Sequence, residues 1–219
     1  MSDDPSRPRT EAEWGRFIRQ SEARSARAME LMETLYEEGA AEDQIERRLC
    51  REMGWPEPDV GGGEADPGYG EATAFDQAGD GAESDGCGPS FREEQPPSGY
   101  DLAYAVGLEV WRTLQGVENA QTTEQTNERI RSAMEHALIP AAKLRGGHAM
   151  GYDDDVLCGY IVYCRIALKA TVTAGEDVQW VTDRGVLPSA TGQHLARRLG
   201  EVASTIEARI TELRNRVWW

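Results

Sequence analysis

Lysine is nearly absent from this chain, since only Lys143 and Lys169 accompany the arginines among its 23 basic residues. Acidic residues number 39, and the formal net charge is −16. Such a composition lacks the basic footprint that holds a phosphate backbone or an anionic membrane. We therefore expect neither DNA nor a membrane as a partner.

Export signals, long apolar runs and a cysteine framework are also missing. The first ten residues, MSDDPSRPRT, lack the basic-then-apolar order of a signal peptide. No uncharged apolar run approaches the roughly 18–20 residues that span a bilayer. Four cysteines in 219 residues do not make a disulfide framework. We expect a reduced, cytoplasmic protein.

The acidity is concentrated in one middle segment. Residues 56–97 contain 11 acidic residues, nine glycines and six prolines, but only one basic residue. A segment of this composition buries too little apolar surface to offset the entropy lost on ordering. We predict a disordered acidic linker over 56–97, and a short disordered tail over residues 1–9.

Residues 10–55 have the pattern of a helical hairpin. Thr10 and Glu13 have the spacing of a capping box, and Gly39 is a typical residue after a helix C-terminus. A second helix is predicted from about residue 41 to 53, where Gly54 ends it. The apolar positions of the two helices, at helical spacing, are Trp14, Ile18, Ala28, Met32, Leu35, Ile45, Leu49 and Met53.

Residues 98–219 contain four helical patterns, over about 100–115, 122–140, 153–174 and 189–217. We expect Pro140 to kink or end the second, and continuation of the helix to residue 145 is the alternative. We expect a loop at 146–151. The third is apolar on nearly all sides and has to be covered by others. The fourth carries an unbroken seam, at Leu195, Leu199, Val202, Ile206, Ile210, Leu213 and Val217. We predict an all-α chain, with an antiparallel four-helix bundle joined by the linker to the hairpin.

Metal and cofactor chemistry have little support in the sequence. The chain contains no Glu-x-x-His pair, which di-iron bundles require. Cys158 and Cys164 are six residues apart, so their side chains leave a helix from different faces. We expect no metal site and no cofactor. One alternative remains, a small-ligand or metal site near His148. The three histidines, His136, His148 and His194, lie on separate predicted elements, and whether they converge in space is open at this point.

A second alternative rests on Arg131-Ser-Ala-Met-Glu-His136. This segment resembles the Arg-x4-His signature of HEPN-type ribonucleases, which are small all-helical domains. The resemblance implies a catalytic pair of Arg131 and His136 acting on RNA.

The leading hypothesis is a non-catalytic helical scaffold or assembly subunit, which binds a protein partner or a second copy through its helices. A thin amphipathic hairpin on a long linker favours it, as do the paired tryptophans at the end of the chain. The predicted partner-binding residues are Trp14, Ile18, Ile45, Leu49, Trp218 and Trp219.

The linker assignment predicts that deletion of residues 61–90 leaves the melting temperature of the bundle nearly unchanged, because this segment contributes no core. Differential scanning calorimetry of the full-length and deleted chains measures the effect. Limited proteolysis should cut first between residues 56 and 97. Strong protection of that segment would contradict the assignment.

Overall fold

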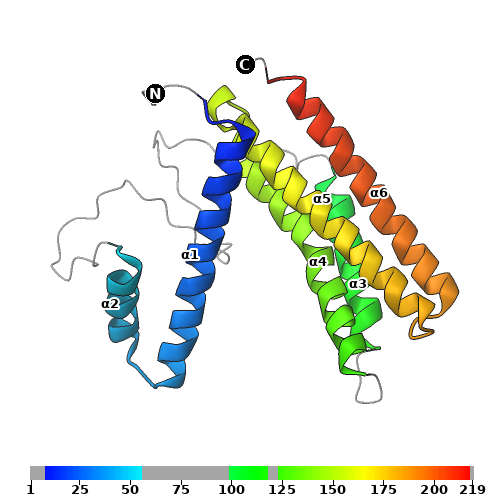
Figure 1. Cartoon of the computed structure of the whole chain (residues 1–219), viewed down its shortest axis with the longest axis horizontal. Coiled ribbons are helices and arrows are strands. Elements are labelled where there is room, and N and C mark those ends of the chain that lie inside the picture. Colours follow the sequence, from blue (N-terminus) through cyan, green and yellow to red (C-terminus); the bar gives the residue numbers. More distant parts are fainter. Residues whose placement is uncertain (1–7, 56–98, 118–122, 218–219) are drawn as a thin grey trace, which may run out of the picture. The chain divides into compact units, whose positions relative to one another are not determined.

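The computed structural model describes residues 8–55, 99–117 and 123–217, without the side chains of Glu42 and Asp43. The all-α prediction is confirmed, because the described residues form six helices and no strand (Figure 1). The predicted linker lies outside the described residues, as does most of the predicted tail. The helices are α1 (Glu11–Glu37), α2 (Glu42–Met53), α3 (Tyr100–Gln115), α4 (Glu124–Ala149), α5 (Asp154–Asp183) and α6 (Ser189–Arg214).

The helices belong to two compact units. One contains the start of α1, through Ile18, together with α3 to α6. The other contains the rest of α1, from Arg19, together with α2. The division therefore falls inside α1 and not at a loop.

The predicted ends of α1 and α2 are confirmed by their hydrogen bonds. The backbone N–H of Thr10 donates to Glu13 Oε2 (2.8 Å), and that of Glu13 donates to Thr10 Oγ1 (3.3 Å). Gly39 and Gly54 have φ of 72° and 65°, a left-handed conformation that glycine adopts without strain. Beyond Gly54, the N–H of Trp55 donates to the Cys50 carbonyl (2.8 Å), which closes α2.

α3 to α6 pack as a bundle around one hydrophobic core. α5 lies against both α4 and α6, α3 lies against α4, and α3 meets α6 less extensively (Figure 1). Tyr160, Ile161 and Cys164 of α5 are fully buried. The predicted seam of α6 is confirmed, because its positions from Leu195 to Leu213 are all buried.

α5 is longer than predicted. It continues through Gly175 for two further turns, to Asp183, and these turns bury Val178 and Val181. Among the described helices, α5 is also long and apolar enough to cross a membrane by length and composition, although no such span was predicted from the sequence. A buried core helix can have the same length and composition. In α5, 56% of the apolar stretch of 18 residues is buried inside the protein.

α4 also extends beyond its predicted end. It runs through Pro140, which is buried, and on to Ala149, so the predicted loop at 146–151 is wrong for its first four residues. Proline removes the backbone donor to the carbonyl of residue 136, but packing of this stretch into the core offsets that cost. Gly147 lies directly beneath the ring of Tyr160, where an added Cβ would come within 2.2 Å of the ring. Close helix packing therefore explains the glycine.

Alanine substitutions at two helical glycines should change the stability of the protein in opposite directions. An added Cβ at Gly107 of α3 would come 2.6 Å from the backbone oxygen of Ala137, whereas at Gly200 of α6 it would meet nothing within 4 Å. We expect Gly107→Ala to cost about 1–3 kcal/mol through overpacking. Gly200→Ala should stabilise the protein by about 0.5–1 kcal/mol through helix propensity. Urea denaturation of both variants measures the difference, and equal stabilities would contradict the α3–α4 packing.

Candidate functional site

The first turns of α1 pack on the protein's own bundle. Trp14 and Ile18, two of the predicted partner-binding residues, are 8% and 3% exposed and form a cluster with Cys158 and Val162 of α5. Trp14 Nε1 donates a hydrogen bond to the backbone oxygen of Asp155 (3.3 Å). These two side chains therefore act as internal anchors.

An ion-pair network surrounds this contact. Glu11 pairs with Arg165 of α5 and with Arg214 of α6, the latter at 3.3 Å. Burial raises the pKa of the Cys158 thiol, and the nearby Glu11 carboxylate raises it further. A thiol in such surroundings stays protonated near neutral pH, so it is a weak nucleophile.

Of the remaining predicted partner-binding residues, two lie on α2 and two lie outside the described residues. Ile45 of α2 is 3% exposed, and Leu49 is half-buried. Trp218 and Trp219 lie outside the described residues. Arg24 of α1 donates to the backbone oxygen of Met53 (3.3 Å), and Arg48 pairs with Glu38 (3.2 Å), so α2 is held to α1 by polar contacts as well.

Arg131 and His136 have separate partners. Arg131 pairs with Glu124 (3.3 Å) at the start of α4, and about half of its side chain is exposed. His136 Nδ1 donates to the backbone oxygen of Ser132 (2.8 Å), one turn earlier in the same helix. Five residues turn a helix by about 500°, or 140° net, so the two side chains leave α4 on different sides.

A buried carboxylate lies beside His136. Asp177 of α5 is fully buried and accepts hydrogen bonds from Arg129 Nη1 and Ser132 Oγ, both at 2.6 Å. Ser132 Oγ also lies 3.2 Å from His136 Nδ1. In a catalytic triad the histidine stands between serine and aspartate, but here the serine stands between the other two. The serine donates to the aspartate, so this arrangement secures α4 to α5 and does not activate a nucleophile.

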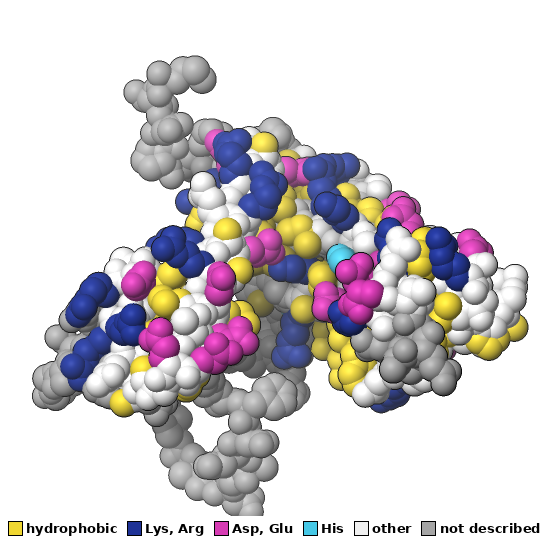
Figure 2. Space-filling model, turned by 60° about the horizontal axis from the view of Figure 1, so that its bottom comes forward, with side chains coloured by type: hydrophobic (Ala, Val, Ile, Leu, Met, Phe, Trp, Pro, Cys, Tyr) yellow, Lys and Arg dark blue, Asp and Glu magenta, His cyan; other side chains and the backbone are white. Residues whose placement is uncertain are grey.

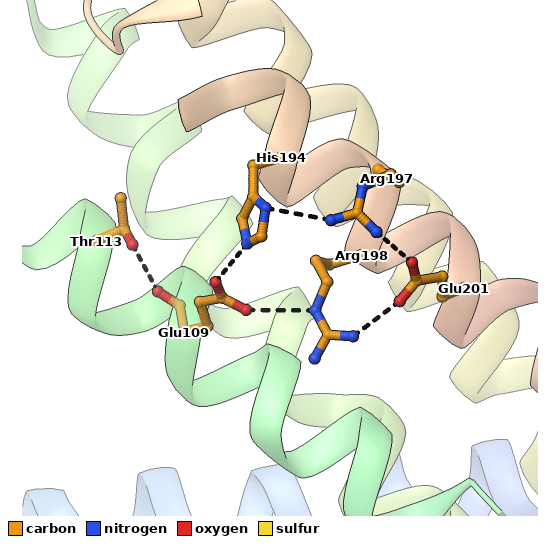
Figure 3. A network of polar contacts seen from close by, with 6 residues as sticks. All are labelled: Glu109, Thr113, His194, Arg197, Arg198 and Glu201. Carbon is orange, nitrogen blue, oxygen red and sulfur yellow. Dashed lines mark hydrogen bonds and ion pairs between the residues drawn. The ribbon is translucent and has the colours of Figure 1, made fainter. Parts of the chain in front are cut away.

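Charged side chains of α3 and α6 interact with one another where these two helices meet (Figure 3). Glu109 of α3 accepts from His194 Nε2 (2.7 Å) and lies 3.6 Å from Arg198 Nε of α6. Glu201 pairs with Arg197 and Arg198, so both glutamates belong to one network. Each glutamate in the network therefore pairs with at least one arginine.

The ends of α4, α5 and α6 meet in an aromatic cluster. Arg209 of α6 donates to the Tyr152 hydroxyl (3.0 Å) and lies over the rings of Tyr152 and Tyr160, at 5.5 and 5.4 Å from their centroids. His148 is hydrogen-bonded to the same Tyr152 hydroxyl. Burial raises the pKa of Tyr160, and it raises that of Cys164 to about 12. These groups stay protonated near neutral pH and contribute packing.

The three histidines do not converge. Their principal partners are Ser132 for His136, Tyr152 for His148 and Glu109 for His194. Among the residues that the structure describes, no three or more His, Cys, Asp or Glu side chains lie close enough together to hold a metal ion.

An exposed apolar surface lies on the second half of α1. Met29, Met32 and Tyr36 are 65%, 36% and 59% exposed, and Met32 is one of the apolar positions that the sequence analysis placed at helical spacing. They surround a shallow hollow of about 790 Å³, which we call the acidic methionine face; its residues are Ala26, Met29, Glu30, Met32, Glu33, Tyr36 and Glu37. In Figure 2, the unit that contains α2 and the rest of α1 exposes hydrophobic, acidic and basic side chains.

This face was not predicted from the sequence, although the sequence contains a signal for it. Met29, Met32 and Tyr36 recur at helical spacing, and a glutamate follows each of them. The half-buried Leu31 and the buried Leu35 are interleaved with them. Two apolar stripes therefore run side by side along α1, and the stripe with Leu31 and Leu35 is the more covered one.

The buried carboxylate yields a stability prediction. Asp177→Ala removes the acceptor of two hydrogen bonds and leaves the partly buried Ser132 hydroxyl without its partner, so it should cost about 1–3 kcal/mol. Asp183→Ala, an exposed position on the same helix, should stay within about 0.5 kcal/mol of the parent. Urea denaturation followed by circular dichroism measures both. Equal costs for the two variants would show that Asp177 does not secure α4 to α5.

Comparisons with known proteins found no match to this chain, neither among family models nor among curated proteins nor among solved structures. Function therefore has to be inferred from the chain's own residues. Of the surfaces described above, the acidic methionine face is the one whose large side chains are apolar and exposed.

Proposed function

We propose that this protein is a non-catalytic helical interaction protein, and that it binds a protein partner through the acidic methionine face. The bundle formed by α3 to α6 serves as a stable body, and α1 with α2 presents the binding surface. The observation that carries the proposal is the exposure of Met29, Met32 and Tyr36 along a single face of one helix.

Exposed apolar side chains in isolation are common and need no explanation, but a contiguous group of them marks an interaction surface. Met29, Met32 and Tyr36 are contiguous, since they are three and four residues apart on a helix. Methionine adapts its shape to a partner, and tyrosine is enriched among the residues that dominate binding energy. The composition of the face therefore suits protein recognition.

The polar chemistry of the bundle supports a non-catalytic role. Asp177, Ser132 and His136 bond to one another or to α4, and Glu109 is engaged by α6. A ribonuclease that uses Arg131 and His136 is the alternative, and it would require both side chains to leave these partners and approach one substrate.

Photo-crosslinking tests the proposal. A photoreactive amino acid replaces Met32 in the full chain, which is then irradiated in an extract of its source organism. We expect a discrete protein adduct, because the partner would lie directly over this position. The matched control replaces Val172, an apolar residue of α5 that is 48% exposed, and it should give no such adduct. Absence of an adduct at position 32, or the same adduct at both positions, would contradict the proposal.

Incubation with RNA tests the alternative. We expect the purified full chain not to cleave RNA, because Arg131 and His136 lie on different sides of α4. Cleavage that His136→Ala abolishes without unfolding the protein would establish the ribonuclease instead. Gel analysis of labelled RNA measures cleavage, and circular dichroism measures the fold.

A further inference from the structure

We infer that the segment bound by the acidic methionine face is a basic amphipathic helix, with an apolar stripe and a row of lysine or arginine along one flank. This inference rests on the proposed function, because it names the partner of the same surface. The charge of the face and its shape are the observations that support the inference.

The dimensions of the face suit a short helix. Its residues, from Ala26 to Glu37, cover about three turns of α1, or about 18 Å. The hollow of about 790 Å³ is shallow and open, and the described residues that line it all belong to α1. An elongated apolar surface of this kind is complementary to a second helix that presents side chains at every third or fourth position.

Acidic side chains run along one flank of this surface. Glu30, Glu33 and Glu37 are exposed and recur at steps of three and four, so they form a row beside Met29, Met32 and Tyr36. Among the residues that the structure describes, none forms an ion pair with these three carboxylates. Like charges this close repel one another, and a facing row of cations would relieve that repulsion.

Charge also argues against the other occupants of such a surface. In a symmetric dimer each copy contributes the same patch, so the glutamates of one copy would lie along the same seam as those of the second. Nucleic acids and anionic membranes carry the same sign of charge as this row. A basic amphipathic helix would bury the apolar stripe and also place cations opposite the glutamates.

The two parts of the face have different roles in recognition. Methionine side chains accommodate apolar groups of several shapes, so they give affinity with little selectivity. The glutamates lie on one flank only, so they select the sign of the partner's charge and the direction in which its charged row faces. We therefore expect the charge of a bound helix to matter more than the identity of its apolar residues.

A pair of labelled peptides tests the inference. The first is an amphipathic helix of about 18 residues, with leucine at every third or fourth position and lysine or arginine along one flank. The second is identical except that glutamate replaces each basic residue. Fluorescence anisotropy with the full chain measures their binding. We expect the basic peptide to bind and to weaken at about 0.3 M salt, and the acidic peptide not to bind.

Variants of equal charge locate the site. Glu30→Gln with Glu33→Gln should weaken binding of the basic peptide by about three- to tenfold. Glu46→Gln with Glu52→Gln changes the net charge equally at exposed positions of α2, and it should leave binding unchanged. Met32→Gln should weaken binding, whereas Val172→Gln should not. Equal binding of both peptides, or an equal effect of the two double variants, would overturn the inference.

Two further outcomes separate this inference from the proposed function. If the segment cross-linked to position 32 is acidic or uncharged, the inference fails and the proposed function stands. If light scattering shows a dimer that Met32→Gln dissociates, a second copy occupies the face and the inference fails. A monomer that cross-links to a basic helical segment supports both.

Discussion

Burial of α5 is the constraint on which the bundle depends. A helix of 30 residues that is apolar on nearly all sides of its first half has to be covered on several faces at once. α4 and α6 cover most of it, and the first turns of α1 cover the side that carries Cys158 and Val162. Gly147 and Gly159 let their neighbours approach closely, because Tyr160 and Trp14 occupy the space that a larger side chain would need.

Polar groups in the bundle specify how the helices fit together. Asp177 is fully buried, and Arg129 and Ser132 of α4 stabilise its charge with two short hydrogen bonds. A shift of α4 along α5 would break both bonds and leave a buried carboxylate without donors, which is costly. α3 meets α6 less extensively, and there exposed ion pairs around Glu109 contribute specificity more than free energy.

The proposed interaction surface is exposed because α1 is covered unevenly along its length. Trp14 and Ile18 are buried, and so is Leu35, but Met29, Met32 and Tyr36 are not. The glutamates that follow these three residues keep this exposed surface hydrated, because carboxylates hydrate well. In the complex that we propose, the same glutamates would restrict the partner to a positive charge. In this proposal, the charge of the glutamates accounts both for the hydration of the free surface and for the selection of its partner.

Periodicity and capping chemistry by themselves determined that the described chain is helical, where α1 and α2 end, and which face of α6 is buried. These features depend on residues one to four positions apart, such as Thr10 with Glu13 or the steps from Leu195 to Leu213. Only the tertiary structure decided that α4 continues through Pro140 and Gly147 and that α5 continues through Gly175, because packing against neighbouring helices outweighs the local cost of these residues. It also decided that Trp14 is covered while Met32 is exposed. Both are apolar residues of one helix, and the partner that covers an apolar side chain lies far away in the sequence, where periodicity carries no information.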